Sequence, residues 1–172
     1  MIECEEIFDK YKNQIYSLCL KLTRDKSDAE DLFGNTWAKV YAKIFGLKNE
    51  LNPFSYIYTV CINIYRKNLK KKSKSLKADF KTEKEYNLFL ERPDTVDVEN
   101  KTIEDEEKLL LKKAIDNLND KYRVPLILFY YRDCSYNDVA NILKLPVSTV
   151  KYRLSFAKSQ LSKILLENDK NG

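Results

Sequence analysis

The sequence predicts an all-α protein in which two small helical domains are joined by a flexible linker. Glycine and proline, which interrupt helices, number only 3 and 4 among 172 residues. Apolar side chains recur at helical spacing along most of the chain, with no sign of β-strand alternation. This periodicity disappears over residues 73–102, where charge accumulates and Pro93 interrupts any helix beyond one turn near 84–90. We therefore expect domains over residues 1–72 and 103–172, with 73–102 as the linker.

Three helices are expected in the first domain. The first spans about residues 5–23, and its buried face carries Phe8, Tyr11, Ile15, Leu18 and Leu22. Either Asp25 or Ser27 can cap the second helix, whose first-turn acids suit the helix dipole. The third begins at Pro53, where a missing N–H costs nothing, and ends at about residue 71. Helices of these lengths predict a compact three-helix bundle.

Four helices are expected in the second domain. The first begins at Ile103, and its apolar face carries Leu109, Leu110, Ala114, Ile115 and Leu118. A break at Asn119-Asp120 precedes a helix over about residues 124–131, with Pro125 in its first turn. Two short helices joined by a tight turn follow over residues 135–161.

The last two helices have the pattern of a helix-turn-helix. Val139, Ala140, Leu143 and Leu145 recur at helical spacing up to Pro146, and the small Ala140 permits a close helix crossing. Ser148 and Thr149 supply hydroxyls that can cap the final helix. At the turn, Lys144 stands where glycine is the easiest choice, at a cost of about 1 kcal/mol if φ is positive.

The final helix is amphipathic, with a polar and basic outer face. Its apolar stripe is Val150, Leu154, Ala157 and Leu161. The outer face carries Ser148, Thr149, Lys151, Tyr152, Arg153, Ser155 and Lys158. This arrangement suits a helix that enters the major groove of DNA. An ordinary αα-hairpin that packs a core has the same apolar pattern, so both interpretations stay open.

Charge is distributed in blocks along the chain, whose net charge is +5. The segment 66–77 reads RKNLKKKSKSLK and holds seven bases and no acid. Residues 78–117 are acidic, and residues 118–163 are basic again. Two basic segments suit a protein that contacts a polyanion at two places, although a solvated, lysine-rich helix end gives the same composition.

Several classes of function find no support in the composition. Four scattered cysteines form no C-x-x-C pair, and the chain has no histidine to complete a zinc site or act as a general base. We therefore expect reduced core thiols, no cofactor, no metal and no enzymatic activity. The N-terminus is acidic, unlike a secretory signal, and no apolar run reaches the roughly 20 residues that span a bilayer. A cytoplasmic location is expected.

Taken together, these blocks resemble a sigma-70 family factor of the extracytoplasmic-function (ECF) type. Regions 2.1 and 2.2 of the family resemble IYSLCLKLTRDKSDAEDLFGNTWAKVYAKI, and regions 2.3 and 2.4 resemble NPFSYIYTVCINIYRKNLKK. Region 4 resembles NLNDKYRVPLILFYYRDCSYNDVANILKLPVSTVKYRLSFAKSQL. The sequence departs from the family pattern at Gly34-Asn35, Lys67, Asn119, Lys144 and Phe156.

The resemblance implies a factor that binds core RNA polymerase, directs it to promoter DNA and helps to open the duplex. The polymerase contacts it implies are Asp28, Glu30, Asp31, Asn35 and Trp37. The residue types allow a second interpretation, in which the acids cap the helix and Trp37 fills the core. A cognate anti-sigma factor is a further partner that the resemblance implies.

The same resemblance implies two DNA contacts. At the −10 element, Asn63, Tyr65, Arg66 and Lys67 would hold an unstacked base, while Lys70 and Lys71 would bind phosphates. At the −35 element, Lys151, Tyr152, Arg153 and Ser155 would face base edges, with Ser148 and Thr149 near the backbone. A stand-alone helix-turn-helix regulator is the alternative, and it would bind duplex DNA without polymerase. An interaction protein, such as a sequestering adaptor, would leave these basic faces unused.

Overall fold

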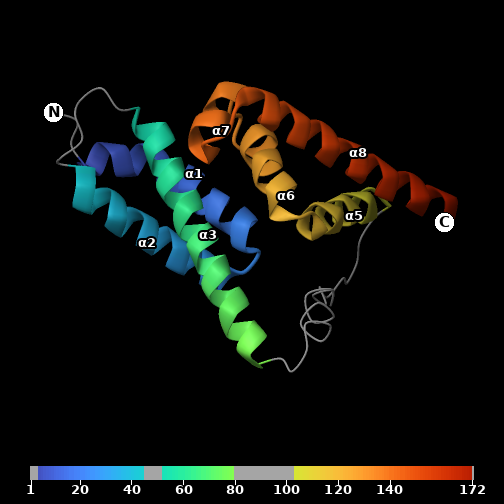
Figure 1. The fold of residues 1–172 in the computed structure, drawn as a ribbon, viewed down its shortest axis with the longest axis horizontal. Helices are drawn as coiled ribbons and strands as arrows, with labels where there is room; N and C mark the ends of the chain where they lie inside the picture. The colour runs from blue at the N-terminus through green and yellow to red at the C-terminus, as the bar shows by residue number, and fades with distance from the viewer. Residues whose placement is uncertain (1–3, 45–51, 80–102, 172) are drawn as a thin grey trace.

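A computed structural model describes residues 4–44, 52–79 and 103–171 of the chain (Figure 1). The elements in order are α1 (Cys4–Thr23), α2 (Lys26–Ile44), α3 (Pro53–Asp79), α5 (Ile103–Asn117), α6 (Asp120–Leu126), the π-helical η1 (Ile127–Tyr131), α7 (Tyr136–Leu143) and α8 (Val147–Asn171). Every regular element within these ranges is a helix, so the predicted all-α class is confirmed. None of the described helices has the length and apolarity needed to cross a membrane.

Helices α1, α2 and α3 pack against one another as the predicted bundle. Asp25 caps α2, because its Oδ2 accepts a hydrogen bond from the Asp28 backbone N–H at 3.1 Å. Of the two predicted caps, Asp25 is therefore the one used. The turn before it is made by Arg24, whose φ of 61° is left-handed. This turn brings the end of α1 close to the start of α2.

Helix α3 is longer than predicted. Asn52 caps it by accepting from the Phe54 N–H at 3.1 Å, and the helix continues to Asp79 instead of ending near residue 71. No glycine or proline interrupts residues 72–79, and the lysines, the leucine and the alanine there are good helix formers. The predicted linker therefore begins inside a helix. The helical turn expected near residues 84–90 lies outside the described residues.

Helix α6 begins earlier than predicted. Asn119 caps it by accepting a hydrogen bond from the Lys121 N–H at 3.0 Å, so the helix starts at Asp120 and not near residue 124. Pro125 lies inside α6 and not in its first turn. Because proline donates no backbone hydrogen bond, the regular ladder is interrupted there, and the chain continues as the π-helical η1.

The helix-turn-helix is present in α7 and α8. Ser135 and Asp138 form a reciprocal capping box at the start of α7. At its end Lys144 adopts φ 57° and ψ 47°, which is the left-handed conformation anticipated for the turn. Helix α8 begins at Val147, and the Pro146 carbonyl accepts from the Val150 N–H at 3.2 Å. The prediction that Ser148 and Thr149 cap α8 is wrong, because both lie within its first turn.

The two halves of the chain pack into one body. Helix α7 lies against α3 (Figure 1). The π-helical η1 lies against α1. Buried apolar side chains from both halves belong to one continuous cluster, from Leu18 and Ile62 on one side to Leu128 and Ile142 on the other. The α1–α3 bundle and the helix-turn-helix are thus held in contact.

Candidate nucleic-acid interface

The outer face of α8 presents most of the predicted DNA contacts to solvent. Ser148, Lys151 and Ser155 are exposed, and Tyr152 has an exposed fraction of 61%. Thr149 is half-buried. Arg153 is also half-buried, and its Nε is shielded from solvent without a hydrogen-bond partner in the described part of the chain. The face turned outward is therefore built from Lys151, Tyr152 and Ser155, with Arg153 at its margin.

Two lysines of α8 make cation–π contacts with aromatic side chains beside the helix. The Lys151 Nζ lies 5.4 Å from the ring centroid of Tyr136, and the Lys158 Nζ lies 5.2 Å from that of Tyr130. Tyr136 stacks on Phe129 at 4.8 Å. A hydrogen bond with Tyr130 raises the pKa of Lys158, which keeps this ammonium charged. Sequence reasoning missed Tyr130 and Tyr136; the run of aromatic residues before the helix-turn-helix was the available signal.

A second basic face lies along α3. Asn63, Lys67, Lys70 and Lys71 are exposed, and Arg66 is half-buried. Asn63 and Lys67 are four residues apart, so they project from the same side of the helix. The lysines that follow continue this stripe toward the end of α3, where a nucleic-acid backbone can follow them.

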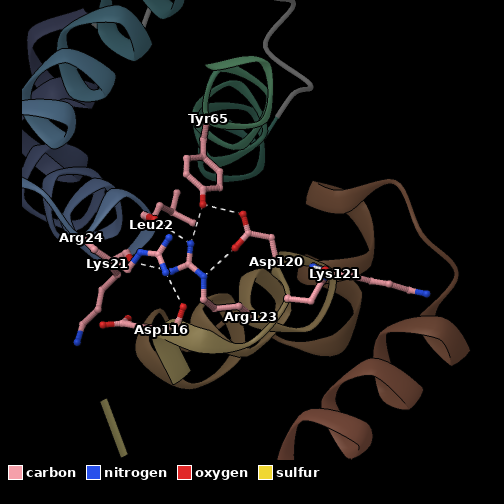
Figure 2. A network of polar contacts seen from close by, with 9 residues as sticks. Lys21, Leu22, Arg24, Tyr65, Asp116, Asp120, Lys121 and Arg123 are labelled. Carbon is pink, nitrogen blue, oxygen red and sulfur yellow. Dashed lines mark hydrogen bonds and ion pairs between the residues drawn. The ribbon is translucent and has the colours of Figure 1, made fainter. Parts of the chain in front are cut away.

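Tyr65 lies on the opposite side of α3 from Asn63. Two residues turn a helix by about 200°, so these side chains point away from each other. Tyr65 has an exposed fraction of only 4%. Its hydroxyl donates to the Asp120 Oδ2 at 2.7 Å and accepts from the Arg123 Nη2 at 2.6 Å (Figure 2). Burial raises the pKa of Tyr65 to about 12, so the phenol keeps the proton that it donates.

Arg123 of α6 is the centre of this contact, and no part of it is exposed. Its Nε donates to the Asp120 Oδ1 at 2.8 Å. Its Nη1 donates to the Lys21 carbonyl at 3.0 Å, and its Nη2 donates to the Leu22 carbonyl at 2.8 Å (Figure 2). A guanidinium thus caps the C-terminal carbonyls of α1 from the other half of the chain. Sequence reasoning missed Arg123 because its α1 partners lie about a hundred residues away and no local pattern marks them.

The exposed face of α2 carries three of the five predicted polymerase contacts. Glu30, Asp31 and Asn35 are exposed. Asp28 is partly exposed, and its Oδ2 pairs with the Lys72 Nζ of α3 at 2.6 Å. Trp37 is buried in the core, where its ring meets Phe8 edge-on at 4.8 Å. Its position fits the core-filling interpretation, while the acids lie on an accessible surface.

Three of the four thiols, those of Cys19, Cys61 and Cys134, belong to the core. Cys19 and Cys61 are fully buried, with their Sγ atoms 3.8 Å apart, and the mutual hydrogen bond and burial raise the pKa of Cys19. Burial likewise raises the pKa of Cys134 to about 12. Cys19 and Cys134 therefore remain neutral thiols at physiological pH. Among the described residues, no cluster of three or more acidic, cysteine or histidine side chains has the arrangement of a metal site.

Comparisons with known proteins match both halves of the chain. Sigma-70 region 2 matches residues 7–75, and sigma-70 region 4 matches residues 108–161. The ECF RNA polymerase sigma factor SigW of Bacillus subtilis is 26% identical over 163 residues, covering 93% of this chain and 87% of SigW. The RNA polymerase sigma-H factor of Pseudomonas aeruginosa is 23% identical, covering 91% of this chain and 82% of that protein.

Two solved structures share the fold. The sigma factor RpoE from Bartonella quintana, in complex with the anti-sigma factor NepR, aligns with a TM-score of 0.73 at 20% identity, covering 94% of this chain and 95% of that one. CnrH, in complex with the cytosolic domain of CnrY, aligns with a TM-score of 0.66 at 14% identity, covering 96% and 88%. The likeness extends over both halves of the chain.

Proposed function

The chain belongs to the sigma-70 family as a sigma factor of the ECF type, and from this membership we propose how its surfaces act in transcription initiation. It binds core RNA polymerase, directs it to promoters through −10 and −35 elements, and promotes opening of the duplex. Sigma factors are initiation factors and not enzymes. One observation carries the proposal: region 2 and region 4 occur in one chain, in this order.

Polymerase binding is assigned to the exposed face of α2. Glu30, Asp31 and Asn35 present two carboxylates and an amide at an accessible surface, which suits a basic partner surface. Asp28 contributes from the edge of this face once it leaves Lys72. Trp37 supports the face from the core beneath it.

Contact with the −10 element is assigned to residues 1–72. Asn63 and Lys67 lie on the exposed side of α3, with Arg66 beside them. Lys70 and Lys71 continue the stripe as phosphate contacts that carry no sequence information. Tyr65 is the aromatic side chain on which an unstacked base would pack, and it must leave its buried position to do so.

Contact with the −35 element is assigned to residues 103–172. Lys151, Tyr152 and Ser155 face outward from α8, as a helix in the major groove requires. Ser148 and Thr149 lie in the first turn of α8, where hydroxyls and backbone N–H groups can hold a phosphate. Arg153 reaches the duplex from the margin of the helix.

The partners follow from the same assignment. The two solved relatives are complexes with an anti-sigma factor and with the cytosolic domain of CnrY. We assign a cognate anti-sigma factor to this chain as well, and we place the protein in the cytoplasm, where core polymerase and promoter DNA are found.

Run-off transcription tests the function. Core polymerase from a bacterium is combined with this protein and a pool of genomic promoters, and new transcripts with defined start sites are expected. Replacing Lys151→Ala together with Tyr152→Ala should reduce them about tenfold or more, because each base contact is worth about 1–3 kcal/mol. The matched control is Lys163→Ala with Leu166→Ala, which removes a lysine and a large exposed side chain farther along α8.

Binding to core polymerase separates this function from the stand-alone regulator. Glu30→Lys with Asp31→Lys should weaken binding to core polymerase, whereas Glu167→Lys with Asp169→Lys, at the exposed end of α8, should leave it unchanged. A protein that shifts duplex DNA by itself, never engages core polymerase and adds no transcript would be a helix-turn-helix regulator instead.

A further inference from the structure

We propose that Phe156, supported by Tyr122 and paired with Tyr152, gives the −35 contact a preference for thymine by packing on the 5-methyl group of that base. The Phe156 cluster consists of these three aromatic side chains, which come from α6 and α8. Phe156 is one of the positions at which the sequence departs from the family pattern, so the preference would belong to this chain. The inference rests on the proposed function, since it assigns a base preference to the same helix.

The three rings form one apolar surface across two helices. Helix α6 packs against α8 (Figure 1). Across this contact the rings of Tyr122 and Phe156 stack, with their centroids 4.4 Å apart and their planes at 29°. Tyr152 precedes Phe156 by four residues, so both rings project from one side of α8, with centroids 6.3 Å apart. Rings at these separations make favourable aromatic contacts.

Phe156 is held at the surface of α8 and not in its core. The apolar stripe by which α8 packs on the core is formed by other residues, namely Val150, Leu154, Ala157 and Leu161. Phe156 is half-buried, and the neighbouring Tyr152 is exposed. Because the stack on Tyr122 fixes the orientation of the Phe156 ring, the ring loses little conformational freedom when it binds a ligand.

The exposed cations of the outer face lie on the other flank of α8. Lys151 and Lys158 are seven residues apart and lie beside Tyr136 and Tyr130. Arg153 precedes Phe156 by one turn, but it is half-buried and its Nε is shielded from solvent. Guanine is best recognised by a long cation that donates to its O6 and N7 atoms. The flank that carries Phe156 is therefore less suited to guanine than the flank that carries the lysines.

Other exposed groups near the Phe156 cluster fit the same assignment. The hydroxyls of Ser155 and Ser159 are on the exposed face of α8, and a serine can bond to any base. The Lys121 Nζ lies 5.6 Å from the ring centroid of Tyr122. Lys121 belongs to α6 and not to the helix that enters the groove, so it suits a phosphate of the DNA backbone.

An aromatic pair can distinguish thymine by contact and by exclusion. Thymine presents a methyl group in the major groove, and apolar contact with a phenylalanine is one way to recognise it. Placed against Phe156 and Tyr152, this methyl group leaves water together with part of both rings. Cytosine presents an amino group instead, and the purines present N7. Such polar atoms would lose water against the rings without gaining a hydrogen bond.

Selection from a randomised promoter pool tests the preference. Holoenzyme is assembled from bacterial core polymerase and the full-length chain, and it selects among duplexes randomised over the −35 element. The wild-type chain should enrich T·A pairs at one or two adjacent positions. Phe156→Arg should replace this preference with G·C, because arginine donates to the O6 and N7 atoms of guanine.

Replacing thymine by uracil at the selected positions isolates the methyl group, because uracil keeps every hydrogen-bonding atom of thymine. Wild-type holoenzyme should bind the uracil promoter about fourfold more weakly, the effect of removing one methyl-sized group from apolar contact. Phe156→Ala and Tyr152→Ala should each lower this ratio to about one. Tyr122→Ala should lower it to about twofold, because the Phe156 ring then loses its support.

Two matched controls should keep the fourfold ratio. Phe129→Ala removes a half-buried ring that stacks on Tyr136 at 4.8 Å, on the other flank of α8. Leu166→Ala removes a side chain with the same exposed fraction as Tyr152, 61%. The ratio compares two DNA molecules bound by one protein, so a variant that folds less well lowers both affinities and leaves the ratio unchanged.

The results separate this inference from the proposed function. A holoenzyme that selects promoters without preferring thymine over the −35 element would overturn the inference and leave the function standing. A thymine preference that uracil satisfies equally, or a fourfold ratio that persists in Phe156→Ala and Tyr152→Ala, would overturn it too. Methyl-dependent binding by the chain alone, without any binding to core polymerase, would instead support the inference and count against the proposed function.

Discussion

At the scale of single residues, Lys144 makes the turn of the helix-turn-helix under strain. Its φ of 57° lies in the left-handed region, where a side chain costs about 1 kcal/mol relative to glycine. The position is nevertheless well bonded, because the Leu145 N–H donates to the Ala140 carbonyl at 3.0 Å as the helix ends. This hydrogen bond at the end of α7 holds the backbone of Lys144 in the left-handed conformation, although lysine is a less favourable residue there than glycine.

Replacing this lysine tests the strain. Lys144→Gly should raise the free energy of unfolding by about 0.5–1 kcal/mol, because glycine adopts the left-handed conformation without the side-chain penalty. Urea denaturation monitored by circular dichroism measures the change. Lys163→Gly, an exposed position inside α8, should instead lower the free energy of unfolding by about 1 kcal/mol. Equal effects at both positions would show that the turn stores no strain.

At the scale of helices, side-chain caps determine where the elements begin. Asp25, Asn52, Asn119 and Ser135 each accept a hydrogen bond from a backbone N–H within the first turn that follows. Ser148 has the right side chain for this role but lies inside the first turn of α8, whose start is set by Pro146. A residue with a capping side chain caps a helix only where its own backbone is non-helical, as that of Ser135 is and that of a residue inside the first turn is not.

This difference predicts unequal effects of two serine substitutions. Ser135→Ala should lower the free energy of unfolding by about 1 kcal/mol, because the Asp138 N–H loses its 3.0 Å acceptor and the capping box is lost. Ser148→Ala should change it by less than about 0.5 kcal/mol. Urea denaturation compares the two. A cost at Ser148 as large as that at Ser135 would contradict the start of α8 at Val147.

At the scale of the whole molecule, one core joins both domains, and several ionisable groups are buried at or near their border. Burial raises the pKa of Tyr65 and of Tyr58 to about 12, from an ordinary value of 10.0, and that of Cys134 to about 12 from 9.0. The folded chain therefore keeps these protons at pH values where the unfolded chain loses them. The sequence has no histidine that would titrate near neutral pH.

Stability should consequently fall on the alkaline side. The contribution of these groups is fully present below pH 9 and is lost as the pH rises from about 9 to 12, because the unfolded state then binds fewer protons. A two-unit shift corresponds to about 3 kcal/mol for each tyrosine. Urea denaturation at a series of pH values measures the slope, which should be nearly flat from pH 6 to 8. Tyr65→Phe should make the alkaline slope shallower, and an unchanged slope would mean that Tyr65 titrates normally.

The sequence by itself determined the helical class, the apolar face of each helix and the helix-turn-helix, because these depend on local periodicity and turn chemistry. It also identified the outer faces of α2, α3 and α8, since exposed charge follows the same periodicity. Only the tertiary structure decided that Trp37 is in the core and that Tyr65 bonds to Arg123 and Asp120. The partners of Arg123 in α1 are about a hundred residues away, and such a contact depends on how two domains pack and not on any local pattern.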